Sequence, residues 1–200
     1  MKTVFLHGLG QNAHDWDAVI NCAALPEVDC PELLALTKEE GTYSAIIMGL
    51  EKRYADTKEP LRLCGLSLGA ILALDYTIRH KEKVDSLILI GVQIKVPTLL
   101  IDIQNLIFRC MPKKAFLDMG VSKESMIRLS HSMRSLDFTS GLKEVKCPVK
   151  ILCGEKDNAN LKASKQLGRL LPQAELHIIP GAGHEINKCA PEVIAKILKN

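Results

Sequence analysis

The chain has 200 residues, of which 47% are hydrophobic and 24% charged, as in an ordinary globular protein with one domain-sized core. Its formal net charge of +3 is too small to indicate binding to nucleic acid or a membrane surface. No apolar run approaches the roughly 20 residues that cross a bilayer, and the start reaches His7-Gly8 too soon for a secretion signal. We therefore expect a cytoplasmic protein with no stable membrane insertion and no nucleic-acid partner.

The cysteines give no sign of a metal site or a disulfide framework. There are seven, an odd number, and they are scattered without a C-x-x-C pair or a Cys/His cluster at zinc-ligand spacing. This pattern predicts reduced thiols packed as small hydrophobic side chains. We expect no metal and no other cofactor.

Short β-branched or leucine-rich runs alternate with helical patterns, which is typical of a parallel sheet with crossover helices. The predicted strands cover residues 3–6, 29–33, 61–64, 86–90, 149–153 and 175–179. The predicted helices between and after them cover residues 15–21, 42–54, 68–80, 161–171 and 191–199. Pro31 favours an edge position for the second strand, because proline cannot donate a ladder hydrogen bond.

Residues 92–140 interrupt the alternation. They contain two prolines and three helical patterns, at 99–110, 113–119 and 122–134. The sequence therefore predicts a single α/β domain over residues 1–200, with about six strands and a helical insertion at about 92–140 after the fourth strand.

The sequence Gly65-Leu66-Ser67-Leu68-Gly69 is a G-x-S-x-G motif between a predicted strand and a predicted helix. Chance gives this pattern in about one random chain in fifteen, and the strand–helix context makes coincidence several-fold rarer. So tight a turn strains the serine backbone and places its hydroxyl at a helix N-terminus, where the helix dipole favours negative charge. Ser67 is the candidate nucleophile.

A serine hydroxyl is a weak nucleophile at neutral pH and needs a base within hydrogen-bond reach. His184 follows the last predicted strand in the glycine-rich sequence GAGH. A loop histidine is by itself more often solvated than catalytic, but the combination with Ser67 makes His184 the candidate general base. The other histidines are His7, His14, His80, His131 and His177.

The base works best when a carboxylate holds its second ring nitrogen and stabilises the imidazolium. Asp157 follows the fifth predicted strand and is the candidate for this role. Glu155, two residues earlier, is the alternative and is otherwise an exposed turn residue. The chain order Ser, Asp, His, with each residue after a strand, matches one class of catalytic triad and not the others.

Acyl transfer also needs two hydrogen-bond donors aimed at the developing oxyanion. One candidate is the backbone N–H of Leu68, directly after the nucleophile. The other is the N–H of Leu9, in the loop His7-Gly8-Leu9-Gly10 after the first predicted strand. We expect His7 to brace this loop rather than to react.

Together these four loops resemble the α/β-hydrolase superfamily along essentially the whole chain: HGLG at 7–10, GLSLG at 65–69, GEKD at 154–157 and GAGH at 181–184. The resemblance implies a doubly wound, mostly parallel sheet with its site at the carboxyl ends of the strands. The chain begins at what resembles the family's third strand, which implies a minimal six-stranded sheet. Related dehalogenases and epoxide hydrolases carry aspartate as nucleophile, so Ser67 favours ester, thioester or amide chemistry.

In the family, an insertion after the fourth of these strands forms a lid over the site. Residues 92–140 hold seven basic and four acidic side chains, an excess equal to the net charge of the whole chain. A basic lid could attract an anionic acyl group, but solvated faces of amphipathic helices explain the same charges more readily. Four methionines could line an acyl pocket or simply pack in a core. They are Met111, Met119, Met126 and Met133.

These patterns favour a carboxylic ester hydrolase that acts on a small-molecule ester or thioester. Thioester, C–C bond or lyase chemistry on the same three residues is the first alternative. A ligand-binding protein that keeps the fold without catalysis is the second. The substrate, its acyl length and leaving group, and the oligomeric state are left open by the sequence.

Overall fold

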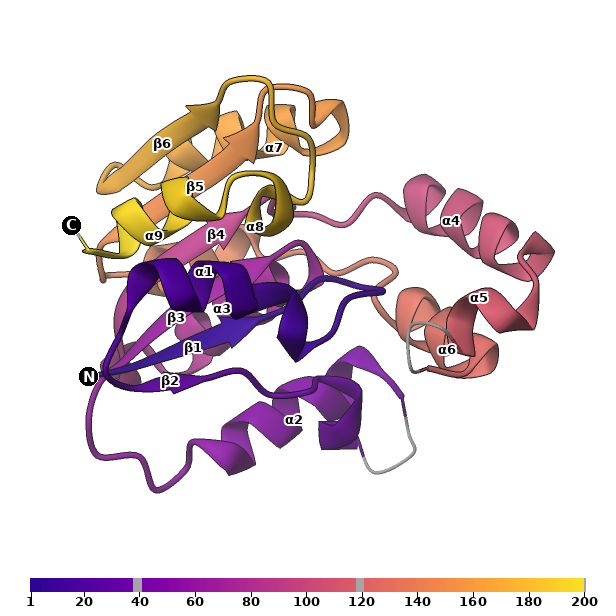
Figure 1. The fold of residues 1–200 in the computed structure, drawn as a ribbon, viewed down its shortest axis with the longest axis horizontal. Coiled ribbons are helices and arrows are strands. Elements are labelled where there is room, and N and C mark those ends of the chain that lie inside the picture. Colours follow the sequence, from indigo (N-terminus) through magenta and orange to yellow (C-terminus); the bar gives the residue numbers. More distant parts are fainter. Residues whose placement is uncertain (38–40, 118–120, 200) are drawn as a thin grey trace.

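The computed structural model describes residues 1–37, 41–117 and 121–199. Six strands form one sheet in the order β2-β1-β3-β4-β5-β6, and every neighbouring pair is parallel (Figure 1). The strands are Lys2–Leu6 (β1), Val28–Asp29 (β2), Leu61–Leu66 (β3), Val84–Ile90 (β4), Val149–Gly154 (β5) and Ala174–Ile179 (β6). The central strands are apolar along their whole carboxyl-terminal halves because helices cover both faces of the sheet.

The helices divide between the two faces of the sheet and the insertion. Those flanking the sheet are Asp17–Ala23 (α1), Tyr43–Arg53 (α2), Leu68–Arg79 (α3), Asn158–Leu170 (α7), Ile186–Cys189 (α8) and Pro191–Lys199 (α9). Those of the insertion are Thr98–Cys110 (α4), Lys113–Leu117 (α5) and Lys123–Ser132 (α6). Short 3-10 turns cover Ala13–Trp16, Leu34–Thr37, Lys81–Lys83 and Thr139–Glu144.

Two apolar clusters fill the space between the sheet and its helices. On one face, α1 and α9 pack against side chains such as Phe5, Cys64 and Ile88. On the other face, α2, α3 and α7 pack against side chains such as Leu63 and Leu89. Because the helices cover the two faces of the sheet, the edge at which the strands end is lined by loops.

The sequence-based prediction of six strands and of the α/β class is confirmed, but the second strand was placed wrongly. Residues 29–33 were predicted as a strand, whereas β2 is only Val28–Asp29, at the edge of the sheet as expected. The strand stops before Pro31, and the Leu33 N–H then binds His7 Nε2 at 3.2 Å. Since that amide is committed to a side chain, it cannot extend the ladder.

Two helical predictions also need correction. The helix predicted at 15–21 is a 3-10 turn at Ala13–Trp16 followed by α1, and Asn12 caps the turn by accepting from the His14 N–H at 2.9 Å. The short helix α8, just after His184, was not predicted. Four residues carry too little periodicity to reveal a helix in sequence.

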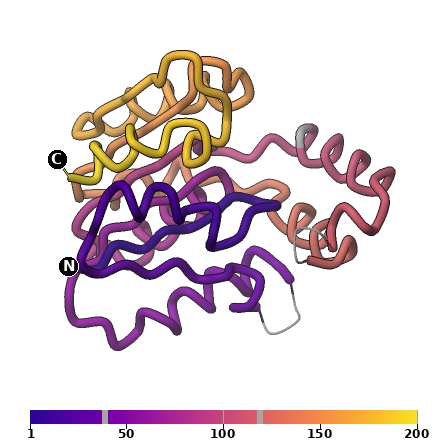
Figure 2. Tube along the Cα trace, viewed as in Figure 1, coloured from indigo at the N-terminus to yellow at the C-terminus, as the bar shows by residue number. Residues whose placement is uncertain are grey.

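The insertion lies beyond the carboxyl ends of the strands (Figures 1 and 2). Its departing and returning segments run side by side: Val96 N–H donates to Leu136 O at 2.9 Å, and Phe138 N–H donates to Ile94 O at 3.0 Å. An antiparallel bridge and an ion pair of 3.2 Å join Lys95 and Asp137 between them. We call residues 94–96 and 136–138 the stem of the insertion.

Of the methionines that could line an acyl pocket, Met126 and Met133 are buried and Met111 is half-buried. Met119 lies outside the described residues, as does Asp118, one of the four acids counted in the insertion.

In the described part of the chain, no helix combines the length and apolarity needed to cross a membrane.

Leu72 of α3 is fully buried between the helix and the sheet. We expect Leu72→Ala to lower the free energy of unfolding by about 2–5 kcal/mol, because it removes buried methyl groups and leaves a cavity. Met48 of α2 is 64% exposed, and Met48→Ala is expected to change stability by less than about 0.5 kcal/mol. Urea denaturation measures both; equal effects would contradict the described packing.

Candidate active site

The turn between β3 and α3 places Ser67 in an unusual backbone conformation. Its φ of 54° and ψ of −113° lie where side chains with a Cβ are rarely found. Such strain costs on the order of 1–3 kcal/mol and persists only where the surrounding structure enforces it. Here the Ser67 N–H donates to Ile90 O, the last residue of β4, at 2.8 Å, and the serine side chain is left half-buried at the strand ends.

The turn requires glycine at both ends of the motif, because no side chain would fit at either position. A Cβ on Gly65 would overlap the carbonyl of Gly69, and a Cβ on Gly69 would overlap the carbonyl of Leu6 in β1. The first residues of α3 therefore press directly against two strands. This contact fixes the position of the serine relative to the sheet.

Asp157 and His184 are in direct contact, as the order of the loops predicts. His184 Nδ1 lies 2.7 Å from Asp157 Oδ2. The Asp157 side chain is only 4% exposed, whereas that of His184 is 37% exposed. The carboxylate is thus enclosed behind the imidazole, and the ring presents an open side to solvent.

The Asp157 carboxyl is held in its ionised form. Its burial alone would raise its pKa, but hydrogen bonds from His184 and from Asn160 outweigh burial and lower the pKa below the usual 3.8. An ionised carboxylate can only accept hydrogen bonds. It therefore requires a proton on His184 Nδ1 and leaves Nε2 as the ring nitrogen that can take a proton from elsewhere.

Gly91, directly after β4, brings the serine and the Asp–His pair together. Its φ is +58°, and a Cβ there would lie 2.8 Å from His184 Cε1 and 3.2 Å from Asp157 Oδ2. Because the Ser67 N–H is hydrogen-bonded to the carbonyl of the preceding residue, Ile90, the backbone of the serine turn and the Asp157–His184 pair are both held at the end of β4. In the described part of the chain the Ser67 hydroxyl has no hydrogen-bond partner of its own; bonds of this kind often tighten only when substrate is bound.

The two predicted oxyanion donors are also free to act. Leu68 begins α3, so its N–H has no partner within the helix. Within the described residues, neither this N–H nor that of Leu9 has a hydrogen-bond partner. The loop carrying Leu9 is closed on itself, since the Gly8 N–H donates to Gln11 Oε1 at 3.0 Å and the Gln11 N–H donates to Gly8 O at 3.1 Å.

His7 braces this loop. Its Nδ1 lies 3.0 Å from Gly8 O, and its Nε2 accepts from the Leu33 N–H at 3.2 Å. Burial lowers the pKa of His7, so the ring is neutral, and the two contacts require the proton on Nδ1. Glu32 lies 3.6 Å from Nε2 and would favour the charged ring, but the Leu33 amide already occupies that nitrogen.

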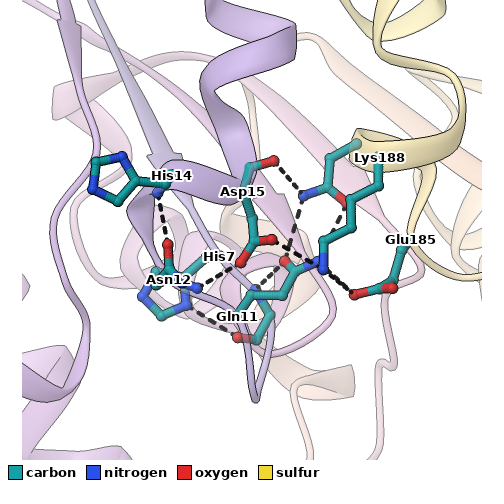
Figure 3. A network of polar contacts seen from close by, with 9 residues as sticks. His7, Gln11, Asn12, His14, Asp15, Glu185 and Lys188 are labelled. Carbon is teal, nitrogen blue, oxygen red and sulfur yellow. Dashed lines mark hydrogen bonds and ion pairs between the residues drawn. The ribbon is translucent and has the colours of Figure 1, made fainter. Parts of the chain in front are cut away.

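A polar network joins the Leu9 loop to the His184 loop (Figure 3). Gln11 Nε2 donates to Glu185 Oε1 at 2.9 Å. Lys188 Nζ lies 2.9 Å from Asp15 Oδ1 and 3.1 Å from Glu185 Oε1. The loop with the candidate oxyanion donor and the loop with the candidate base are therefore held to each other by side chains.

Sequence reasoning missed the residues that support these groups, namely Gln11, Gly91 and Asn160. None belongs to a motif: Gln11 and Asn160 were signalled only by their position just after a motif loop, and Gly91 only by its position after a predicted strand. Glu155, the alternative to Asp157, points elsewhere: its Oε2 accepts from the Gly181 N–H at 2.9 Å.

The histidine at the end of α3 lies apart from this cluster. His80 Nε2 is 3.1 Å from Glu51 Oε1 at the far end of α3. All seven cysteines are free thiols. Among the residues that the structure describes, no group of three or more His, Cys, Asp or Glu side chains is arranged to hold a metal ion.

Comparisons with known proteins agree on the fold. No protein-family model matches the sequence. A Bacillus subtilis (strain 168) protein named as a 2-succinyl-6-hydroxy-2,4-cyclohexadiene-1-carboxylate synthase is 22% identical over 249 aligned positions, covering 98% of this chain and 88% of that protein.

Solved structures are similar over the whole chain. MenH from S. aureus superposes with a TM-score of 0.84 at 18% identity, covering 100% of this chain and 92% of that one. A thermophilic esterase from Thermogutta terrifontis gives 0.81 at 18% identity, covering 100% and 88%. The thioesterase domain from the curacin biosynthetic pathway gives 0.73 at 17% identity, covering 99% and 90%. With its six parallel strands and the serine turn after β3, the chain has the fold of the α/β-hydrolase superfamily.

Proposed function

We propose that the protein is a serine hydrolase that cleaves a carboxylic ester through an acyl-enzyme intermediate. Ser67 is the nucleophile, His184 the general base and Asp157 the residue that orients the histidine. The observation that carries the proposal is the 2.7 Å contact between His184 and Asp157, packed against Gly91 beside the strained Ser67 turn. The similarity to an esterase structure supports the same class of reaction.

Each group has a defined task in the acylation step. His184 Nε2 takes the proton of the Ser67 hydroxyl while the serine oxygen bonds to the ester carbonyl carbon. The carbonyl oxygen becomes an oxyanion, which the N–H groups of Leu68 and Leu9 stabilise. The tetrahedral species then collapses, the ester C–O bond breaks, and His184 gives its proton to the departing alcohol.

Deacylation repeats these steps with water. His184 removes a proton from a water molecule, whose oxygen attacks the acyl carbon bound to Ser67. The second oxyanion uses the same two backbone donors, and the acid product leaves as the serine recovers its proton. Asp157 stays ionised throughout and stabilises the imidazolium formed in each half-reaction.

The insertion supplies the substrate-binding surface in this proposal. Helix α4 carries four exposed apolar side chains: Leu99, Ile103, Leu106 and Ile107. Because α4 lies beyond the strand ends where Ser67 is placed (Figure 1), this face offers an apolar surface to an acyl chain, and the insertion acts as a lid. Every described acid within residues 98–132 is ion-paired, Asp102 with Arg134 at 3.0 Å and Glu124 with Lys113 at 3.1 Å.

Thioester hydrolysis is the second candidate, because the same groups perform it and a thioesterase domain has the same fold. C–C bond or lyase chemistry on the same three residues is a further alternative, which inactivity on every ester would favour. A panel of p-nitrophenyl esters and acyl-CoA thioesters separates these reactions. Binding of a ligand without turnover, unchanged by Ser67→Ala, would instead indicate a protein that uses the fold only to bind.

A fluorophosphonate probe tests the nucleophile directly. We expect a covalent adduct on Ser67 in the wild-type protein and none in Ser67→Ala, with ester hydrolysis reduced by about 10³-fold or more. Ser140→Ala removes an exposed serine and serves as the control with full labelling. Folded wild-type protein that forms no adduct on Ser67 would refute the proposal.

The lowered pKa of Asp157 makes its contribution to stability pH-dependent. A carboxyl whose pKa is lower in the folded than in the unfolded state stabilises the fold at pH values above its unfolded pKa of about 3.9. This stabilisation is lost as the pH falls through the pKa of the folded state. We expect the stability advantage of wild type over Asp157→Asn to be full above about pH 5 and to shrink below about pH 4. Denaturation at several pH values measures it, with exposed Asp56→Asn as control; a pH-independent difference would contradict the assigned hydrogen bonds.

The apolar face of α4 predicts chain-length selectivity. Leu106 is 62% exposed, so Leu106→Ser leaves the core unchanged. We expect it to raise KM for long-chain p-nitrophenyl esters about tenfold relative to the acetate, since one lost apolar contact costs about 1–3 kcal/mol. Met48→Ser, on the exposed side of α2, is the matched control. Equal effects on short and long esters would show that α4 does not contact the acyl chain.

A further inference from the structure

A third side chain contacts the Asp157–His184 pair. Asn160, in the first turn of α7, is buried, and its Nδ2 donates to Asp157 Oδ1 at 2.9 Å and to Oδ2 at 3.0 Å. The same nitrogen lies 3.1 Å from His184 Nδ1. Both nitrogens carry hydrogens, so they do not bond to each other; both donate to the same carboxylate.

Asn160 is itself held by Gln93. Gln93 Nε2 donates to Asn160 Oδ1 at 2.7 Å and to the backbone carbonyl of Ala159 at 2.9 Å. The orientation of both amides follows from their partners, since the carbonyl of Ala159 and the carboxylate of Asp157 can only accept. The direction of donation therefore runs without ambiguity from Gln93 to Asn160 and from Asn160 to Asp157.

Gln93 stands where the insertion joins the sheet domain. It follows Gly91, which contacts His184 and Asp157, by two residues, and it immediately precedes the stem at Ile94. The stem segments are paired by two backbone hydrogen bonds. The backbone that carries Gln93 is therefore held in place by the stem and is not a free loop. A continuous chain of hydrogen bonds thus runs from the root of the insertion to the histidine.

We propose that Asn160 and Gln93 are positioning residues for the reaction. Asn160 fixes the rotation of the Asp157 carboxylate so that Oδ2 faces His184 Nδ1, and Gln93 fixes Asn160 relative to the insertion. With the side chains of His184 and Asn160 both donating, the carboxylate has one orientation; without the Asn160 side chain it keeps the bond to a half-exposed imidazole and the backbone N–H of residue 160. The inference rests on the proposed function, because the positioned group is the general base.

The test compares Asn160→Ala with Asn158→Ala, an exposed asparagine in the same turn of α7. We expect Asn160→Ala to lower kcat for an ester by about 10- to 100-fold with KM nearly unchanged, since a misplaced base slows chemistry and not binding. The low-field proton NMR resonance of His184 Nδ1–H should broaden or move in Asn160→Ala and stay in place in Asn158→Ala.

Gln93→Ala is the second variant, with exposed Gln166→Ala as its control. We expect a smaller loss of kcat than for Asn160→Ala and the same change of the resonance. In a double-mutant cycle, Gln93→Ala should add little to Asn160→Ala, because both act through one chain of bonds. If Asn160→Ala does not fold, the kcat, KM and resonance of Gln93→Ala decide the question.

The outcomes separate this inference from the proposed function. Wild type that is labelled by fluorophosphonate, together with variants that match their controls in kcat and in the resonance, would overturn the positioning role alone. Wild type that is not labelled on Ser67 would refute the proposed function. In that case the resonance still reports whether Asn160 holds the Asp157–His184 pair, and an unchanged resonance in Asn160→Ala overturns that as well.

Discussion

The backbone hydrogen bond from Ser67 to Ile90 holds a strained turn at the end of β4, and the arrangement of the site depends on it. A serine with positive φ would relax if the helix that follows could move away from the sheet. Gly65 and Gly69 prevent this, because their missing side chains let α3 press against β1 and β3. Once the serine is fixed at this edge, the Asp157–His184 pair is brought close to it by packing on Gly91, the residue directly after β4.

The strand ends could be read from the sequence because parallel strands carry their loops to one edge of the sheet. Ser67, Asp157 and His184 each follow an apolar run that predicts a strand, and their order along the chain matched one class of triad. The structure places Asp157 and His184 in hydrogen-bond contact and holds the Ser67 backbone at Ile90, next to the Gly91 on which that pair packs, while their catalytic roles are a proposal. What the sequence could not show is which side chains hold the loops together.

Gln11 and Glu185 illustrate the difficulty. They lie 174 residues apart and bond because two loops converge at the strand ends, a proximity that no local pattern encodes. Asn160 and Gln93 are similar, since an asparagine in a helix and a glutamine after a strand are ordinary surface residues until the fold places Asn160 against a carboxylate and Gln93 against Asn160. The misplaced second strand has the same origin: the amide of Leu33 is taken by His7, a residue from another strand end.

The paired stem also bears on how the sequence of such a chain can evolve. Because residues 94–96 and 136–138 are hydrogen-bonded to each other, the insertion joins the domain as the tip of an antiparallel ribbon does. A ribbon of this kind can be closed by a short turn or by a long helical segment without altering the strands beneath it. Segments of different length and polarity could thus be exchanged at this point, altering what the molecule admits while the groups at the sheet edge keep their places.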